Sequence, residues 1–165
     1  MNDPRLMKLI EVASTFAEMW FVQHDEMFGL YHVESKEGDH AVIPVPPGID
    51  KDFATDFMRE LFEKLDVERY VYMNEAWTLD SEYAHVSDDD IKRANREGLA
   101  TFNHPARIEV VMITAENREQ QILATRKIIR PPKRRLRLGP LIIDKRPMLS
   151  GGRMIGLLRP QGTAH

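Results

Sequence analysis

Cysteine is absent from all 165 residues. The chain therefore has no disulfide framework, no thiolate metal site and no cysteine nucleophile, a composition that fits a reducing compartment. The first 21 residues, MNDPRLMKLIEVASTFAEMWF, contain Asp3 and Glu11 and lack the clean apolar run of a secretory signal. Eighteen consecutive apolar residues occur nowhere, so we expect no membrane-spanning helix and a cytoplasmic protein.

The standard local motifs of catalysis and cofactor binding are also missing. The sequence has no glycine-rich dinucleotide or phosphate loop, no zinc-protease or serine-hydrolase motif and no calcium-binding loop. The glycines in GDHAV and SGGRM do not lie between a strand and a helix, which disfavours a phosphate cradle. The sequence therefore predicts no cofactor, although an enzyme without such a motif is not excluded.

Acidic residues are nearly missing from the C-terminal quarter. Residues 126–165 hold 11 of the 23 Lys and Arg but only one acid, Asp144, for a net charge of +10. Residues 1–125 hold the other 12 bases and 25 acids, for a net charge of −13. This division indicates either that the basic part docks on the acidic part, within or between chains, or that it contacts an anionic partner.

Capping and periodicity predict the N-terminal elements. Asp3 followed by Pro4 is typical of a helix start, and apolar residues at three- and four-residue spacing continue to about Val22. The segments MFGLYHV and HAVIPV, separated by a polar turn, predict a hairpin.

A second helix and a long strand are predicted next. Asp50 caps the segment KDFATDFMRELFEKL, and Val67–Leu79 is rich in aromatic and branched residues that favour a strand. The apolar residues expected on one face of this helix are Phe53, Phe57, Met58, Leu61, Phe62 and Leu65. A short helix is expected from Ser87, with Asp90 completing a capping box, to Gly98.

The remaining segments predict a long hairpin around Glu116, Asn117 and Arg118, and two closing strands in LGPLIID and RMIGLLRP. The resulting order is helix, two strands, helix, strand, helix and about four strands. We therefore predict a single α+β domain over residues 1–165, with a mostly antiparallel sheet of six to seven strands, two long helices and one short helix.

Glu75 is the first candidate for chemistry, because strand alternation places it beside Val71, Met73 and Trp77. A carboxylate among apolar side chains must be paired, protonated or near a cleft. One interpretation is a structural ion pair with an arginine of a neighbouring strand. The other is a pocket with a general base of raised pKa, in a small enzyme or ligand-binding protein. The weak catalytic candidates in that pocket are Glu75, His104, Arg107 and Glu109.

The acids Asp88, Asp89 and Asp90, near His85, invite a metal interpretation. Consecutive residues at a helix start point in different directions, however, and helix capping explains all three, so we predict no metal site. His32 and His40 flank a hairpin turn and face each other in the predicted pairing, which offers two ligands at most.

The basic segment IIRPPKRRLRLGPL supplies the second candidate site. The residues predicted to bind an anion or a partner are Arg130, Lys133, Arg134, Arg135 and Arg137. Because no aromatic residue follows Phe102, this segment offers no base-stacking platform for nucleic acid.

The sequence therefore favours a non-catalytic interaction protein with an acidic body and a basic C-terminal part, self-associating through these charges or binding another protein. Nucleic-acid binding through residues 126–159, by salt-sensitive backbone contacts, is the main alternative.

Overall fold

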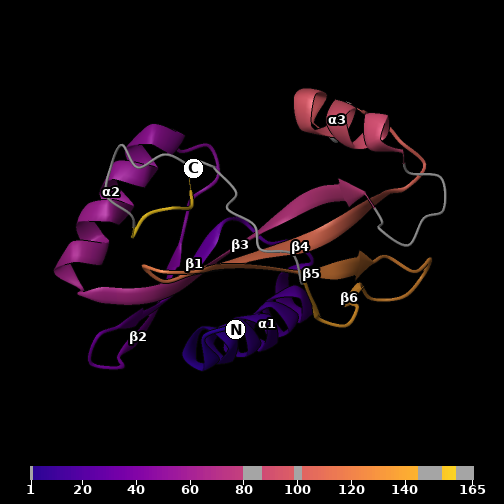
Figure 1. The fold of residues 1–165 in the computed structure, drawn as a ribbon. Helices are drawn as coiled ribbons and strands as arrows, with labels where there is room; N and C mark the ends of the chain where they lie inside the picture. The colour runs from indigo at the N-terminus through magenta and orange to yellow at the C-terminus, as the bar shows by residue number, and fades with distance from the viewer. Residues whose placement is uncertain (1, 80–86, 99–101, 145–153, 159–165) are drawn as a thin grey trace.

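The computed structural model describes residues 2–79, 87–98, 102–144 and 154–158, and these form one α+β domain (Figure 1). Its helices are α1 (Pro4–His24), α2 (Lys51–Lys64) and α3 (Asp88–Glu97). Its strands are β1 (Leu30–Ser35), β2 (His40–Pro44), β3 (Val67–Leu79), β4 (Arg107–Glu116), β5 (Gln121–Ile129), β6 (Arg137–Leu138) and β7 (Ile142–Ile143). The predicted fold class is confirmed. None of the described helices is both long enough and apolar enough to span a bilayer.

All strand pairs are antiparallel, in the order β2-β1-β3-β4-β5-β6, with β7 also paired to β5. Strand β2 therefore forms one edge of the sheet, and β6 lies at the other end. The long strand β3 has the predicted bounds and pairs with β4 over ten residues, from Tyr70 opposite Glu116 to Leu79 opposite Arg107.

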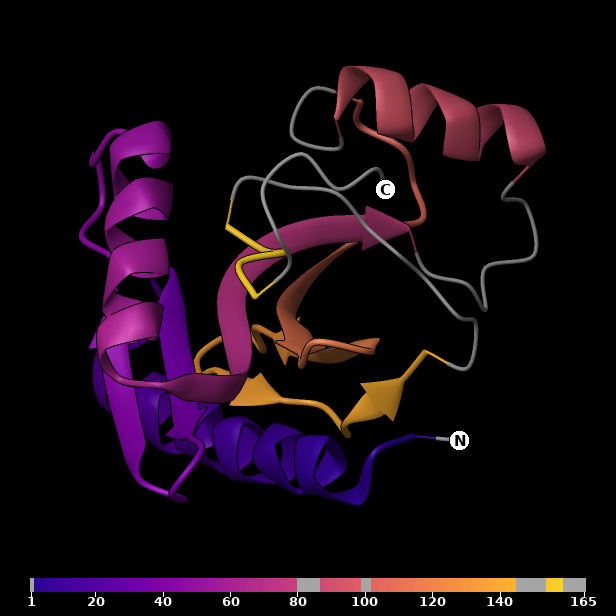
Figure 2. The same ribbon diagram turned by 60° about the vertical axis from the view of Figure 1, so that its left-hand side comes forward.

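Helix α1 covers one face of the sheet (Figures 1 and 2). The Asp3 carboxylate accepts a hydrogen bond from the Arg5 amide, and Pro4 is the first helical residue, as predicted. The helix ends two residues beyond Val22, where Asp25 adopts a left-handed conformation with φ of 57°. Its apolar stripe packs on the sheet in a core of Leu6, Leu9, Ile10, Ala13, Ala17 and Phe21 with Val71, Met73, Val111, Ile113 and Ala124.

Helix α2 and the segment Met154–Leu158 cover the opposite face. The predicted cap at Asp50 is confirmed, and Ala54, Met58 and Phe62 pack against Tyr31 and Tyr70. The predicted apolar face is too wide, because Phe53, Phe57 and Leu65 are 62%, 53% and 41% exposed. A helix packed on a sheet at three-to-four spacing buries a narrow stripe, and these two rings lie beside it.

Two of the predicted C-terminal strands have different outcomes. Part of LGPLIID forms β7, as expected. The prediction of a strand in RMIGLLRP is wrong for residues 154–158, which form turns and a bend, and its remaining residues lie outside the described part of the chain. Their backbone groups are bound by side chains from other elements, as shown below, and not by a strand ladder.

Helix α3 lies beyond the end of β3 and has no buried residue (Figure 2). Its N-terminus is the predicted capping box: Ser87 accepts from the Asp90 amide, and the Asp90 carboxylate accepts from the Ser87 amide. Gly98 ends the helix with φ of 78°, a conformation that favours glycine.

Candidate functional site

The residues between β5 and β6, together with the first residue of β6, form a loop that we name the basic loop, residues 130–137. Strand β6 pairs with the end of β5, opposite Ile128 and Ile129, so the loop is the tip of a hairpin. The Arg134 amide donates to the Pro131 carbonyl, and Lys133 has a left-handed φ of 60°. Two consecutive prolines restrict the loop further, because each fixes its own φ. The five basic side chains, Arg130, Lys133, Arg134, Arg135 and Arg137, are all exposed.

An open pocket of about 510 Å³ lies at this loop. It is lined by Arg130, Pro131, Lys133, Arg134, Arg135 and Leu136, and by Asp25 at the end of α1. Four cations and one carboxylate give the lining an excess of positive charge. Guanidinium groups bind carboxylates and phosphates by paired hydrogen bonds, so the arrangement can hold an anionic group.

The basic side chains differ in whether they already have a partner. The Arg130 guanidinium donates to the Glu109 carboxylate at 2.7 Å. This hydrogen bond raises the pKa of Arg130 above its usual value, and the nearby charges of Glu75 and Asp25 add to the effect. Among the residues that the structure describes, no ion pair involves Lys133, Arg134, Arg135 or Arg137.

Arg126 is the basic residue that turns inward. It lies on the same sheet face as Ile122, Ala124 and Ile128 and is buried beneath α1. Its guanidinium donates to the Gly139 carbonyl at 2.7 Å and to the Ser14 hydroxyl at 3.3 Å, and it lies 3.3 Å from the Glu18 carboxylate. One of the eleven C-terminal cations is therefore used to fasten α1 to the sheet.

Each of the four weak catalytic candidates has a described contact. The Glu75 carboxylate accepts from the Met27 amide at 2.8 Å, and Glu109 accepts from Arg130. The Arg107 guanidinium stacks over the Trp77 ring at 4.1 Å from its centroid.

His104 Nδ1 accepts from the Ala106 amide, so Nε2 carries the proton that points to Asp90, 3.2 Å away. Glu109 is bonded to Arg130, and the charge of Glu75 also acts on Arg130. A common pocket for all four stays a prediction. The hydrogen bond to Arg130 connects Glu109 to the basic loop.

The capping contacts account for Asp90 without a metal ion. Hydrogen bonding to the Ser87 amide is the main cause of a lowered pKa of the Asp90 carboxyl, to which His104 also contributes. No group of three or more histidine and acidic side chains suited to a metal is found in the described part of the chain, and His85 lies outside it.

His32 and His40 do face each other, with ring centroids 5.6 Å apart. His32 is buried in β1, whereas His40 is exposed on β2. Burial lowers the pKa of His32, and the neighbouring His40 lowers it further. His32 is therefore neutral near neutral pH.

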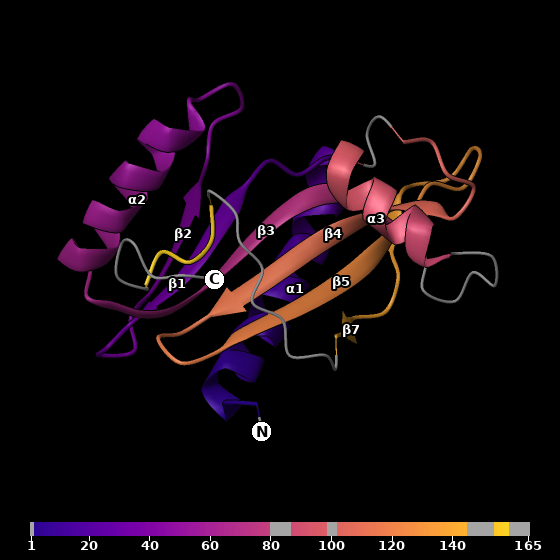
Figure 3. The ribbon, with the colours of Figure 1, turned by 45° about the horizontal axis from the view of Figure 1, so that its top comes forward.

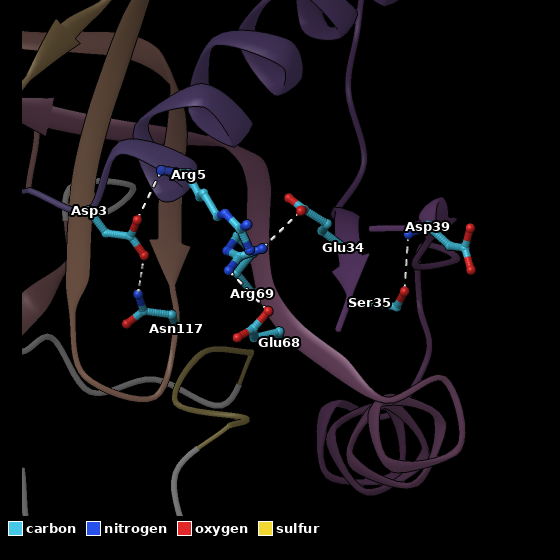
Figure 4. Close-up of polar contacts among 8 residues, drawn as sticks. All are labelled: Asp3, Arg5, Glu34, Ser35, Asp39, Glu68, Arg69 and Asn117. Carbon is cyan, nitrogen blue, oxygen red and sulfur yellow. Dashed lines mark hydrogen bonds and ion pairs between the residues drawn. The ribbon is translucent and has the colours of Figure 1, made fainter. Parts of the chain in front are cut away.

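Arg69, which the sequence analysis did not single out, is a buried arginine on the α1 face. It donates to Glu34 at 2.8 Å and to Glu68 at 3.1 Å, beside the start of α1 (Figure 4). Arg69 lies two residues before Val71, so strand alternation places both residues, like Glu75, on the same face of β3. The sequence therefore contains the pattern that indicates a buried Arg69. These contacts describe a structural ion pair.

Glu116 is the second residue that the sequence analysis missed, because it was assigned to a turn. It is the last residue of β4, only 1% exposed, on the face covered by α2. Its carboxylate accepts from the Tyr70 hydroxyl, from Gln121 Nε2 at 2.5 Å and from the Gly156 amide at 2.7 Å. Burial, and next the charge of Glu116, raise the pKa of Tyr70, so the hydroxyl keeps its proton and donates it.

These side chains hold the segment Met154–Leu158 by its backbone. The Tyr31 hydroxyl donates to the Met154 carbonyl at 2.7 Å, and the Leu157 amide donates to the Tyr70 hydroxyl at 3.3 Å. Arg59 and Arg118 donate to the carbonyls of Leu157 and Leu158, each at 3.3 Å. The buried polar cluster of Tyr31, Tyr70 and Glu116 thus holds the segment Met154–Leu158 on the sheet.

No family model, curated protein or solved structure matches this chain.

Proposed function

We propose that this protein is a non-catalytic interaction protein that binds an acidic protein partner through the basic loop. The observation that carries the proposal is the difference between paired and unpaired cations. Arg126 and Arg130 have acidic partners, whereas Lys133, Arg134 and Arg135 line an open pocket with no ion pair to the described residues. No acidic side chain of the described residues neutralises these three cations, which supports their use in binding a partner.

The chemistry of the pocket favours carboxylates over a phosphate backbone. Leu136 and Pro131 put apolar surface beside the cations, and the loop has no aromatic ring on which a base could stack. Asp25 places a negative charge inside the pocket, which repels an anionic ligand. The repulsion disfavours a nucleic-acid backbone, with its continuous line of phosphates, more than it disfavours the separate Glu and Asp side chains of a protein. Arg134 and Arg135 offer the planar donors that pair with Glu and Asp.

The test uses poly-L-glutamate as the acidic probe, with duplex and single-stranded DNA of similar charge for comparison. Binding is measured by fluorescence anisotropy from low salt to physiological salt. We expect the double variant R134E/R135E to bind poly-L-glutamate at least tenfold more weakly. The matched control K36E/K51E makes the same change in net charge on exposed residues of the β1–β2 turn and α2, and should bind like the wild type.

Two results would overturn the proposal. One is no binding to poly-L-glutamate even at low salt. The other is an equal loss in both double variants, which would show an effect of net charge alone. Tighter binding to DNA that depends on Arg134 and Arg135 would replace the proposal with the nucleic-acid function.

A further inference from the structure

The outer edge of β2 has no strand beside it in the described part of the chain. The two ends of the β1–β2 ladder show which groups face outward. The Ser35 amide donates to the Asp39 carbonyl, and the Val45 amide donates to the Gly29 carbonyl. Because an antiparallel strand bonds to one neighbour at every second residue, Ala41 and Ile43 bond to β1. His40, Val42 and Pro44 therefore direct their backbone groups outward.

This edge is self-complementary about Val42. When a second β2 approaches antiparallel with the two Val42 residues opposite each other, they exchange two hydrogen bonds. The His40 amide of each copy then reaches the Pro44 carbonyl of the other copy. Pro44 lacks an N–H and so forfeits one bond per copy, but the remaining four bonds form.

Apart from Pro44 and the short length of β2, the edge lacks the devices that usually prevent such pairing. Proteins protect exposed strand edges with charged side chains, bulges or covering segments. No Lys, Arg, Asp or Glu occurs in His40–Pro44, and the β1–β2 register is unbroken. Val42 is 38% exposed, so two copies would bury a valine pair at the axis.

Helix α2 adds an apolar surface on the same side of the molecule. Thr55 and Arg59 contact the segment Met154–Leu158, which Figures 1 and 3 show on the flank of α2 toward the middle of the sheet. Thr55 and Arg59 each follow a buried residue, Ala54 or Met58, by one position. Phe53 and Phe57 each precede the same buried residues by one position. One residue is about 100° of helix, so the two phenylalanines project from the opposite flank, toward the β2 edge.

The rings of Phe53 and Phe57 stack on each other, with centroids 6.5 Å apart, and are more than half exposed. Together they expose slightly more than one whole phenylalanine side chain, about 200 Å². A twofold axis perpendicular to the sheet keeps both α2 helices on one face of the joined sheet. The same axis that pairs the strands therefore brings the four rings toward each other.

We propose that this β2–α2 edge, defined by His40–Pro44, Phe53 and Phe57, is a surface for a second copy of the chain. The two copies form a twofold dimer by antiparallel pairing of β2. The shared patch is smaller than a standard interface of about 800 Å² per partner, so the dimer is expected to be a reversible one. This surface is different from the basic loop and does not depend on it.

Analytical ultracentrifugation over a concentration series tests the proposal. We expect the wild type to show a monomer–dimer equilibrium. The substitution Val42→Lys places two like charges opposite each other at the axis and should raise the dissociation constant at least tenfold, as should Phe53→Glu. The matched control Val22→Lys changes an apolar residue of α1 that is 55% exposed, and should leave the dissociation constant unchanged.

Hydrogen exchange supplies a second readout that does not depend on a variant. The Val42 amide points outward, so its exchange should slow as the protein concentration rises, while the Ala41 amide, bonded to β1, changes little. The proposal is overturned if the protein stays monomeric at every concentration up to about 1 mM. This holds also if the β2 edge then binds a strand of another protein. A dimer that neither Val42→Lys nor Phe53→Glu weakens also overturns the proposal.

Discussion

Replacing Glu116 by alanine should destabilise this protein more than any surface substitution. The carboxylate is fully buried, and its removal leaves the Tyr70 hydroxyl and the Gly156 amide without their acceptor. Hydrogen bonds to a charged group contribute about 1.5–3 kcal/mol each, and they are not additive. We therefore expect Glu116→Ala to lower the free energy of unfolding by about 3–5 kcal/mol, because several such hydrogen bonds are lost together.

Urea denaturation followed by circular dichroism measures this loss, and a thermal scan should show a fall of about 10 °C in the melting temperature. Glu116→Gln keeps the shape and an acceptor oxygen, so about 1–2 kcal/mol should be lost. Glu119→Ala, at an exposed position of the neighbouring turn, is the matched control and should change stability by less than about 0.5 kcal/mol. If Glu116→Ala costs less than about 1 kcal/mol, the cluster does not hold the segment Met154–Leu158 as described.

Three further substitutions test other contacts. Arg126→Met should cost about 2–3 kcal/mol in urea denaturation, because it leaves the Gly139 carbonyl and the Ser14 hydroxyl beneath α1 without their donor; a neutral result would refute its fastening role. Burial lowers the pKa of His32 in the folded state. Below pH about 6.5, the pKa of an unfolded histidine, the unfolded state therefore binds the proton more readily, and the free energy of unfolding falls as the pH drops. Denaturation at pH 7.5, 6.5 and 5.5 should show this fall, with a flatter profile in His32→Gln, and equal slopes would count against it. Ser87→Ala removes the capping box and should lower the local stability of α3 by about 1 kcal/mol. Faster hydrogen exchange of the amides of α3 alone measures this loss, and faster exchange throughout the protein would contradict it.

The elements that the sequence predicted correctly are those whose ends are set by local chemistry. Asp3 with Pro4 fixes the start of α1, and Ser87 with Asp90 fixes the start of α3, because each cap needs only residues within one turn. The strand from Val67 to Leu79 was predicted with both its bounds, since its composition differs from that of its neighbours.

The errors arise where distant parts of the chain decide the outcome. The segment 154–158 has the composition of a strand, but Tyr31 and Tyr70 bind its backbone and replace a ladder. Phe53 and Phe57 fit the apolar period of α2, yet nothing in the sequence says how much of that period the sheet covers.

The two proposed surfaces lie at opposite ends of the sheet, and this has a consequence for binding. Strand β2 is at one end of the strand order and β6, with the basic loop, is at the other. Neighbouring strands are about 4.8 Å apart. In the dimer, five such spacings lie between β2 and β6 of each copy and one lies between the two β2 strands, so the two basic loops are separated by about 50 Å. The dimer would therefore engage a partner with two acidic sites, or two partners at once.

A linked pair of sites binds a long acidic chain more tightly than either site alone, provided the chain can span them. If both proposals hold, Val42→Lys should weaken binding to long poly-L-glutamate and leave binding to a short glutamate peptide unchanged. R134E/R135E should weaken both. Equal effects of Val42→Lys on the long and short probes would show that the β2 edge and the basic loop do not act together, even if each proves correct by itself.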